Sequence, residues 1–297
     1  MRRLGRIEAG GARTLKSRNS TLFGGAIFCS FGPSRSPHAD PKTPRTALLN
    51  PKIRPSAGAF SITYKPPKEF TKPNPKLEPL EKAQIEWFAS RGISEKTLER
   101  NRVQFERNAW IAGAPTPAIA FPYFRNGELV NVKYRSIEKR FTQVKGAEKI
   151  LYGLDDVVGA TDVIFVEGEI DKLSLEEAGF SNVVSVPDGA PRDVKEGALP
   201  DPEEDTKFSY LWASRGLLDL AARVIIATDN DGPGNALAEE LARRLGRERC
   251  WRVKWAGDDA PGGKRKDAND VLVNDGPGAL QQAIEKAEAY PIRGLFR

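Results

Sequence analysis

The sequence predicts an α/β protein with a largely parallel sheet, because two stretches share one design and strands alternate with helices around them. In residues 162–171, DVIFVEGEID, a continuous apolar run indicates a strand buried on both faces, and Gly168 then allows a tight turn into a helix. Residues 223–228, RVIIAT, form a second apolar strand, followed by the turn DNDG and a helical pattern over residues 235–245. From about residue 161 to 255 the alternation is typical of a parallel sheet covered by helices.

Acidic side chains follow both strands at their carboxyl ends, where open α/β sheets bind their ligands. Glu167 comes directly after the first strand, and Asp229 and Asp231 come after the second. Burying several carboxylates side by side is unfavourable unless a cation neutralises them, and oxygen ligands at this density suit Mg²⁺ or Mn²⁺. The sequence therefore predicts a divalent-metal site.

Three motifs in this order resemble the TOPRIM fold of primases and topoisomerases: E-G-x-x-D after one strand, D-x-D-x-x-G after the next, and KDAN at residues 266–269. VVSVPDGAP at 183–191, ATDNDGPG at 227–234, LAEELARRLGRERCWRVKW at 237–255 and YPIRGLF at 290–296 resemble the primase half of plant organellar Twinkle-type primase-helicases, which are relatives of the phage replicative primase-helicase. The resemblance covers roughly residues 80–297.

The site residues follow from the motifs and the resemblance together. Glu167, Asp229 and Asp231 are expected to be catalytic and to hold the metal ion, with Asp267 as a further ligand or a neighbour of the ligands. Glu169, Asp171 and Asn269 are expected to support the ligands, since acids in the first turn of a helix also suit its N-terminal dipole.

Residues 80–158 are expected to form a helical hairpin and a basic β subdomain. A helix that stops at Gly92 precedes one capped by Ser94, and Asn126-Gly127 is a strong two-residue hairpin signal. In the resembled primases this region holds nucleotide or template, so the resemblance implies a phosphate-binding platform; the alternative is a solvated charged sheet face. The candidate phosphate-binding residues are Lys133, Arg135, Lys139, Arg140, Lys145 and Lys266.

The remaining segments complete the predicted organisation. Residues 159–290 are expected to form the TOPRIM domain, with a solvated insertion from 192 to about 222, a helix over 267–274 and an edge helix over 278–289. Residues 291–297 resemble the start of a linker to a helicase domain.

The first 80 residues differ in composition from the rest of the chain. They hold 15 Lys and Arg against 4 Asp and Glu, and 11 of the 22 prolines, in a chain of net charge +6. Residues 1–40 are Arg-rich and acid-poor, which favours a transit peptide for the mitochondrion or chloroplast over a disordered basic arm that touches nucleic acid. Residues 41–79 are expected to be a disordered linker rich in Pro and Lys.

Composition and absences narrow the function. With 39% hydrophobic and 29% charged residues the chain is typical of a soluble globular protein, and no apolar run reaches the roughly 18 residues of a membrane span. Two cysteines and one histidine argue against a structural zinc site, and no G-x-x-x-x-G-K-S/T motif is present. Relative to the resembled family, zinc-binding and helicase domains are therefore expected to be missing.

The sequence thus predicts an organellar primase-like protein that binds single-stranded DNA and, with ribonucleoside triphosphates and Mg²⁺, makes short RNA primers. Organellar replication proteins are the expected partners. The alternatives are a noncatalytic nucleic-acid-binding protein and a metal-dependent nuclease, which would use the same carboxylates. A topoisomerase is disfavoured because that activity needs a separate tyrosine-bearing domain.

Overall fold

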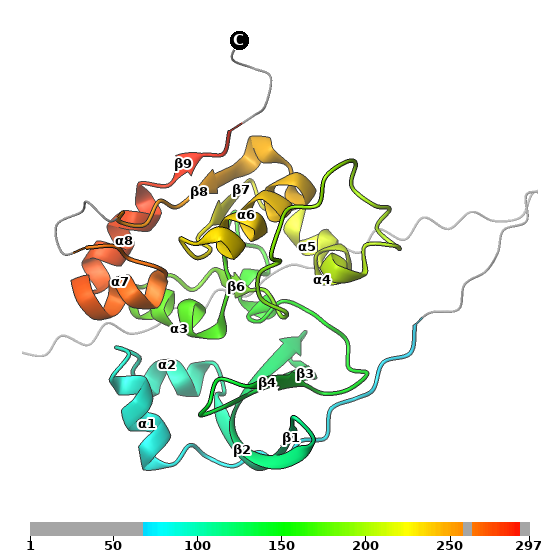
Figure 1. Cartoon of the computed structure of the whole chain (residues 1–297), viewed down its shortest axis with the longest axis vertical. Coiled ribbons are helices and arrows are strands. Elements are labelled where there is room, and N and C mark those ends of the chain that lie inside the picture. Colours follow the sequence, from blue (N-terminus) through cyan, green and yellow to red (C-terminus); the bar gives the residue numbers. More distant parts are fainter. Residues whose placement is uncertain (1–67, 258–262, 292–297) are drawn as a thin grey trace, which may run out of the picture. The chain divides into compact units, whose positions relative to one another are not determined.

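The computed structural model describes residues 68–257 and 263–291, which build two β-sheets with helices around them (Figure 1). One sheet has four strands in the order β1-β2-β3-β4, and the other has five in the order β6-β5-β7-β8-β9. The largely parallel α/β sheet predicted from the sequence is confirmed. The predicted transit peptide at 1–40, most of the predicted linker at 41–79 and residues 292–297 lie outside the described residues.

Two short helices precede the first sheet, as the sequence indicates. α1 (Lys82–Ala89) is followed by Gly92, whose φ of +72° is a left-handed conformation that glycine adopts without strain. α2 (Glu95–Arg100) begins after Ser94, whose hydroxyl accepts a hydrogen bond from the Thr97 backbone N–H. Phe88 of α1 and Leu98 of α2 are buried, so each helix packs one face against the core.

The first sheet is antiparallel and consists of β1 (Gln104–Ile111), β2 (Ala114–Arg125), β3 (Glu128–Ser136) and β4 (Phe141–Gln143). β2 and β3 are joined by the predicted turn, in which Asn126 and Gly127 have φ values of 53° and 78°. Positive φ at both central residues is what a type I′ turn requires. The turn fixes the register, so that Lys133 of β3 stands opposite Phe121 of β2 and Gln143 of β4.

The second sheet has four parallel strands, β6 (Val183–Ser185), β5 (Asp162–Val166), β7 (Arg223–Ile226) and β8 (Cys250–Arg252), and the antiparallel edge strand β9 (Glu288–Ala289). Val163 to Val166 are at most 1% exposed, as expected for a strand covered on both faces. Because β5 and β7 are adjacent and parallel, their carboxyl ends meet at one edge of the sheet.

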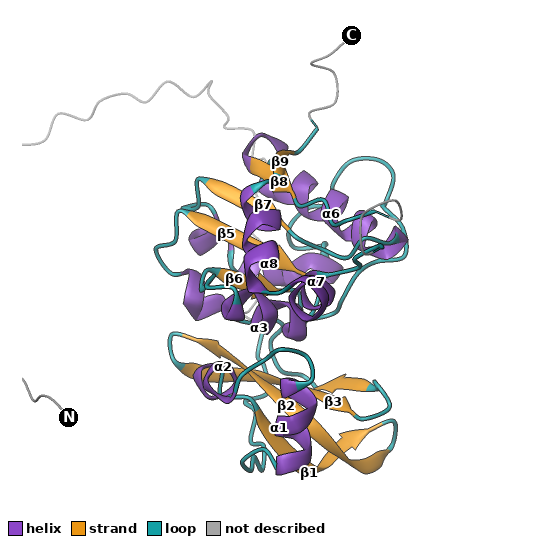
Figure 2. Cartoon of the chain, turned by 90° about the vertical axis from the view of Figure 1, so that its left-hand side faces the viewer, coloured by secondary structure: helices purple, strands orange, loops and turns teal. Residues whose placement is uncertain are grey.

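Helices cover both faces of this sheet. α7 (Ala268–Asp275) and α8 (Pro277–Glu285) pack with Ile164 and Ile225 on one face, beside α3 (Glu169–Glu177) (Figure 2). α6 (Gly232–Leu245) packs on the opposite face against Val163 and Ile226. The other helices are α4 (Ser209–Ala213), α5 (Arg215–Leu218) and three short 3₁₀ turns, η1 (Leu154–Val157), η2 (Thr206–Phe208) and η3 (Arg247–Arg249). Within the described residues no helix is long and apolar enough to cross a membrane.

The last predicted helix ends earlier than expected. α8 stops at Glu285, and residues 288–289 pair with β8 as a short edge strand. The tertiary structure decides this boundary, because the Tyr290 N–H donates to the Cys250 carbonyl at 2.8 Å and the Tyr290 hydroxyl donates to Glu239 at 3.0 Å. A helix running to residue 289 would lose these contacts.

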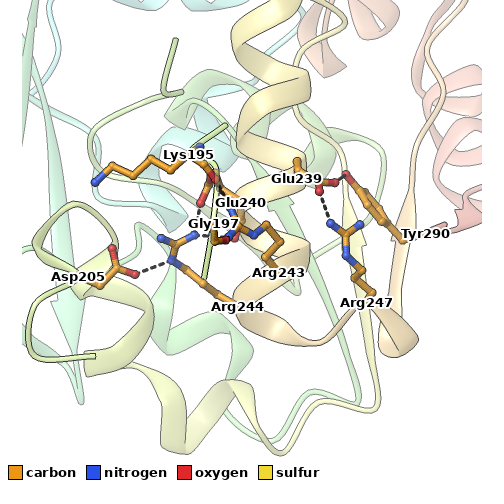
Figure 3. Close-up of polar contacts among 9 residues, drawn as sticks. All are labelled: Lys195, Gly197, Asp205, Glu239, Glu240, Arg243, Arg244, Arg247 and Tyr290. Carbon is orange, nitrogen blue, oxygen red and sulfur yellow. Dashed lines mark hydrogen bonds and ion pairs between the residues drawn. The ribbon is translucent and has the colours of Figure 1, made fainter. Parts of the chain in front are cut away.

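The insertion before β7 is docked on α6, so its description as solvated is wrong for Asp205, which is 3% exposed. Figure 3 shows the anchoring contacts. The Arg244 Nε donates to Asp205 Oδ2 at 2.6 Å, and a second bond from Arg244 reaches Glu240. Arg243 donates to the carbonyls of Lys195 and Gly197, each at 2.6 Å. A buried carboxylate needs such partners, which a sequence pattern does not reveal.

Candidate functional site

The loop that follows β7 carries Asp229 and Asp231 at the predicted edge of the sheet. Asp231 caps α6, since its Oδ1 accepts the Gly234 N–H at 2.8 Å. Gly234 permits the close approach of helix and loop, because a Cβ there would lie 2.2 Å from the Asp229 carbonyl oxygen. Asp229 is 7% exposed, so the loop presents one buried carboxylate and one at its rim.

Lys266, from the KDAN motif, neutralises this pair of carboxylates. Its Nζ lies 2.8 Å from Asp229 Oδ2 and 3.7 Å from Asp231 Oδ2. The hydrogen bond to Asp229 raises the pKa of the lysine above its ordinary value. The Lys266 carbonyl also accepts the Asn230 N–H at 2.7 Å, which holds the two loops together.

Glu167, at the end of β5, belongs to the same electrostatic group. Burial raises its pKa to about 7, and the charges of Asp229 and Asp231 contribute to the rise. Its Oε2 is buried and has no hydrogen-bond partner among the described residues. An unpaired buried carboxylate oxygen is unfavourable in an isolated fold and is typical of a site that awaits a ligand.

The two acids in the first turn of α3 already have protein partners. Glu169, 4% exposed, accepts hydrogen bonds from the Tyr123 hydroxyl at 2.5 Å and the Lys133 Nζ at 2.8 Å. Asp171 accepts the Asn269 N–H at 3.3 Å, and burial raises its pKa well above the ordinary value. The supporting role of Glu169 and Asp171 remains a prediction, and Tyr123 carries no signal in the sequence.

The rest of the KDAN motif supports α7 and joins it to the helical hairpin. Asp267 caps α7 by accepting the Asp270 N–H at 2.8 Å, and burial raises its pKa. The Asn269 side chain donates to the Arg91 carbonyl at 2.9 Å and accepts from Arg91 Nη1 at 3.0 Å. Asp267 as a direct metal ligand remains a prediction; like Asp231, it uses its Oδ1 in a helix cap.

The candidate phosphate-binding residues divide into two groups. Lys133 and Arg135 are each 8% exposed, so the solvated sheet face is wrong for these two. The Arg135 guanidinium lies 4.5 Å from the centre of the Trp87 ring, and burial and the charge of Arg91 lower its pKa. The exposed group comprises Lys139, Arg140, Lys145 and Lys266.

A cleft of about 500 Å³ lies between the first sheet and the end of β5. Its lining includes Lys133, Phe141, Lys149, Glu167 and Asp188. Phe141 is 53% exposed, and the Lys133 Nζ lies 5.5 Å from its ring centre. Lys149 spans the cleft to Asp188 at 2.8 Å. Sequence reasoning missed Phe141, Lys149 and Asp188, although an aromatic residue among basic ones was a usable signal for the first.

The arrangement fits a metal ion held by two carboxylates better than a three-carboxylate cage. Within the described residues, no group of three or more acidic, cysteine or histidine side chains is placed to hold a metal ion. Asp229 and Asp231 nevertheless converge on one positive centre, the Lys266 Nζ. Mg²⁺ commonly binds one or two carboxylates plus substrate phosphates, so two converging oxygens suit it. Glu167 as a third ligand remains a prediction.

Comparison with known proteins shows that the chain matches a family model and resembles two plant proteins. The model of the Toprim domain matches residues 161–254. The Twinkle homolog protein, chloroplastic/mitochondrial, of Arabidopsis thaliana is 54% identical over 220 residues, which are 74% of this chain and 30% of the relative. The primase homolog protein of the same plant is 53% identical over 218 residues, 73% of this chain and 63% of the relative. The chain thus spans less than two thirds of the length of either relative.

Solved structures support the fold. The primase fragment of the bacteriophage T7 primase-helicase superposes with a TM-score of 0.54 at 19% identity, over 73% of this chain and 82% of that one. The RNA polymerase domain of Mycobacterium tuberculosis primase DnaG in complex with double-stranded DNA gives 0.51 at 15% identity, over 70% and 74%. At these identities the likeness concerns the fold alone.

Proposed function

This chain is a Toprim-domain protein similar in sequence to the Twinkle and primase homologues of Arabidopsis, and from that premise we propose that it synthesises short RNA primers on single-stranded DNA in a plant-type organelle. The substrates are ribonucleoside triphosphates. The one observation that carries the proposal is the shared cleft, whose lining combines Glu167 with Lys133 of β3 and Phe141 of β4.

The cleft has the chemistry that a nucleotide requires. About 500 Å³ is within the range of small-ligand pockets, which runs from about 300 to about 1,000 Å³. Phe141 offers an exposed ring on which a base can stack, and Lys133 and Lys149 are cations on the same walls. Because both lysines are paired with acids, Glu169 and Asp188, a phosphate would exchange with a carboxylate as their partner.

Nucleotidyl transfer joins the 3′ hydroxyl of one nucleotide to the α-phosphate of the next and releases pyrophosphate. Asp229 and Asp231 would hold Mg²⁺ or Mn²⁺, which supplies positive charge to the reacting phosphates when bound. Lys133, Arg135, Arg140 and Lys266 would orient the triphosphate. The unpaired Glu167 Oε2 is available to a metal ion or to the proton of the attacking hydroxyl.

The test is ribonucleotide incorporation by the full chain on single-stranded DNA with Mg²⁺ or Mn²⁺. Glu167→Gln should abolish labelled product and leave DNA affinity nearly unchanged, because the lost interaction acts mainly in the transition state. Asp162→Asn is the matched control, since Asp162 opens the same strand and pairs with Arg223 at its far end. This variant should retain activity.

Other outcomes would identify the competing functions. Tight DNA binding without any dinucleotide product, even with Mn²⁺ and abundant nucleotides, would indicate a noncatalytic binding protein. Metal-dependent shortening of the DNA would indicate a nuclease.

The organellar part of the proposal is tested separately. A fluorescent fusion of residues 1–60 should enter mitochondria or chloroplasts, because that segment is Arg-rich and acid-poor. Diffuse cytosolic fluorescence would contradict it.

A further inference from the structure

The ammonium group of Lys266 occupies a position that suits a divalent cation. It lies 2.8 Å from Asp229 Oδ2 and 3.7 Å from Asp231 Oδ2, so both carboxylates direct an oxygen toward one positive centre. The Asp229 side chain is 10% exposed, whereas that of Lys266 is 54% exposed. The carboxylate is therefore fixed in the protein, and the cation reaches it from the solvent side.

The backbone of Lys266 is held by two hydrogen bonds, whereas its side chain is 54% exposed. Its N–H donates to Asp270 Oδ2 at 3.0 Å, and its carbonyl accepts the Asn230 N–H at 2.7 Å. The flexible four-carbon stem lets the ammonium leave the carboxylates without a change in either loop. Because the Lys266 ammonium is about half-exposed, water can solvate it when it leaves, so a cation that binds the carboxylates more strongly can replace it.

We infer that Lys266 is a built-in competitor for the divalent cation: it neutralises Asp229 and Asp231 in the metal-free protein, and metal binding displaces it toward the phosphates of the nucleotide. The inference rests on the proposed function, because it takes the two aspartates as cation ligands.

Displacement has a consequence for the order of binding. A divalent cation and an ammonium group cannot share the space between two carboxylates without strong repulsion. Once the metal ion is bound, the released ammonium remains on the same loop, beside the site, where it can bind a phosphate of the nucleotide. Metal loading thus prepares Lys266 to bind substrate, and the free protein avoids two unneutralised carboxylates.

The test compares Mn²⁺ binding to the full chain and to Lys266→Met, followed by the electron paramagnetic resonance signal of free Mn²⁺. Methionine keeps the length of the side chain and removes the charge. Without its competitor the site should bind Mn²⁺ about tenfold more tightly, while the metal-free variant should melt at a lower temperature because Asp229 and Asp231 have lost their counter-ion. Lys266→Arg keeps the charge and should not tighten binding.

Lys254→Met is the matched control for net charge. Lys254, two residues after the end of β8, is 68% exposed and pairs with Glu288 of β9 at 2.5 Å. Lys254→Met should change the Mn²⁺ affinity less than twofold. Equal or weaker Mn²⁺ binding by Lys266→Met, or binding by neither protein at millimolar Mn²⁺, would overturn the inference. Primer synthesis is measured separately, so a protein that shows this competition but makes no primer would refute the proposed function alone.

Discussion

Glu167 makes the free protein less stable as the pH rises, and Glu167→Gln should remove this effect. The pKa of its carboxyl group rises from the ordinary 4.5 to about 7 in the folded protein, first through burial and then through Asp229 and Asp231. At a given pH between these values the unfolded chain has lost the proton that the folded chain retains. Stability contributed by this group therefore falls between pH 4.5 and about 7 and stays low above that range.

The size of the effect follows from the two pKa values. Each pKa unit corresponds to about 1.36 kcal/mol, so the full difference is about 3.4 kcal/mol. Glu167 is partly exposed, and solvent screening reduces the expected value to about 2 kcal/mol. At pH 5 only about a quarter of this loss of stability is present. For a folded region of this size, about 2 kcal/mol shifts the melting temperature by about 4–8 °C.

The assay is thermal unfolding of the full chain in EDTA at pH 5 and pH 8. Because a quarter of the effect is already present at pH 5, Glu167→Gln should gain about 3–6 °C over the wild type at pH 8 relative to its position at pH 5. The comparison between two pH values removes any constant cost of burying the amide. Asp162→Asn should instead lose stability, since it breaks the ion pair with Arg223. A Glu167→Gln advantage that is equal at both pH values, or larger at pH 5, would refute the argument.

Three further predictions concern the insertion, the Asp229 loop and the cleft. Arg244→Met should lower the free energy of unfolding by about 3–5 kcal/mol in denaturant, since it leaves Asp205 and Glu240 buried without their cation. Arg215→Met, which breaks an exposed pair, should cost less than about 1 kcal/mol. Similar losses for both variants would contradict the anchoring of the insertion. Gly234→Ala should abolish Mn²⁺-dependent stabilisation, because its Cβ would lie 2.2 Å from the Asp229 carbonyl oxygen, and Gly216→Ala, whose Cβ meets no described atom within 4 Å, should retain it. Phe141→Ala should weaken nucleotide binding by about 1–3 kcal/mol in a fluorescence titration and Phe141→Tyr should not; unchanged affinity in Phe141→Ala would exclude stacking.

The positions of the acids along the chain were predictable because strand ends and parallel pairing follow from local pattern. β5 and β7 are apolar after their first residues and lie side by side, so Glu167 and Asp229 had to emerge at the same edge of the sheet. Ser94 at its helix start and Asn126-Gly127 in its turn obey rules that involve only neighbouring residues. The three motifs and their order were sufficient for the fold.

The partners of the long charged side chains were decided only by the tertiary structure. Lys133 and Lys266 were both predicted to bind phosphate, but in the free protein one pairs with Glu169 and the other with Asp229. Asp205 was predicted to be one of several solvated acids, but in the structure it is buried in an ion pair with Arg244. Each of these pairs joins residues 36 to 39 positions apart, and a charge at that distance along the chain selects its partner by burial and geometry, which composition and spacing do not specify.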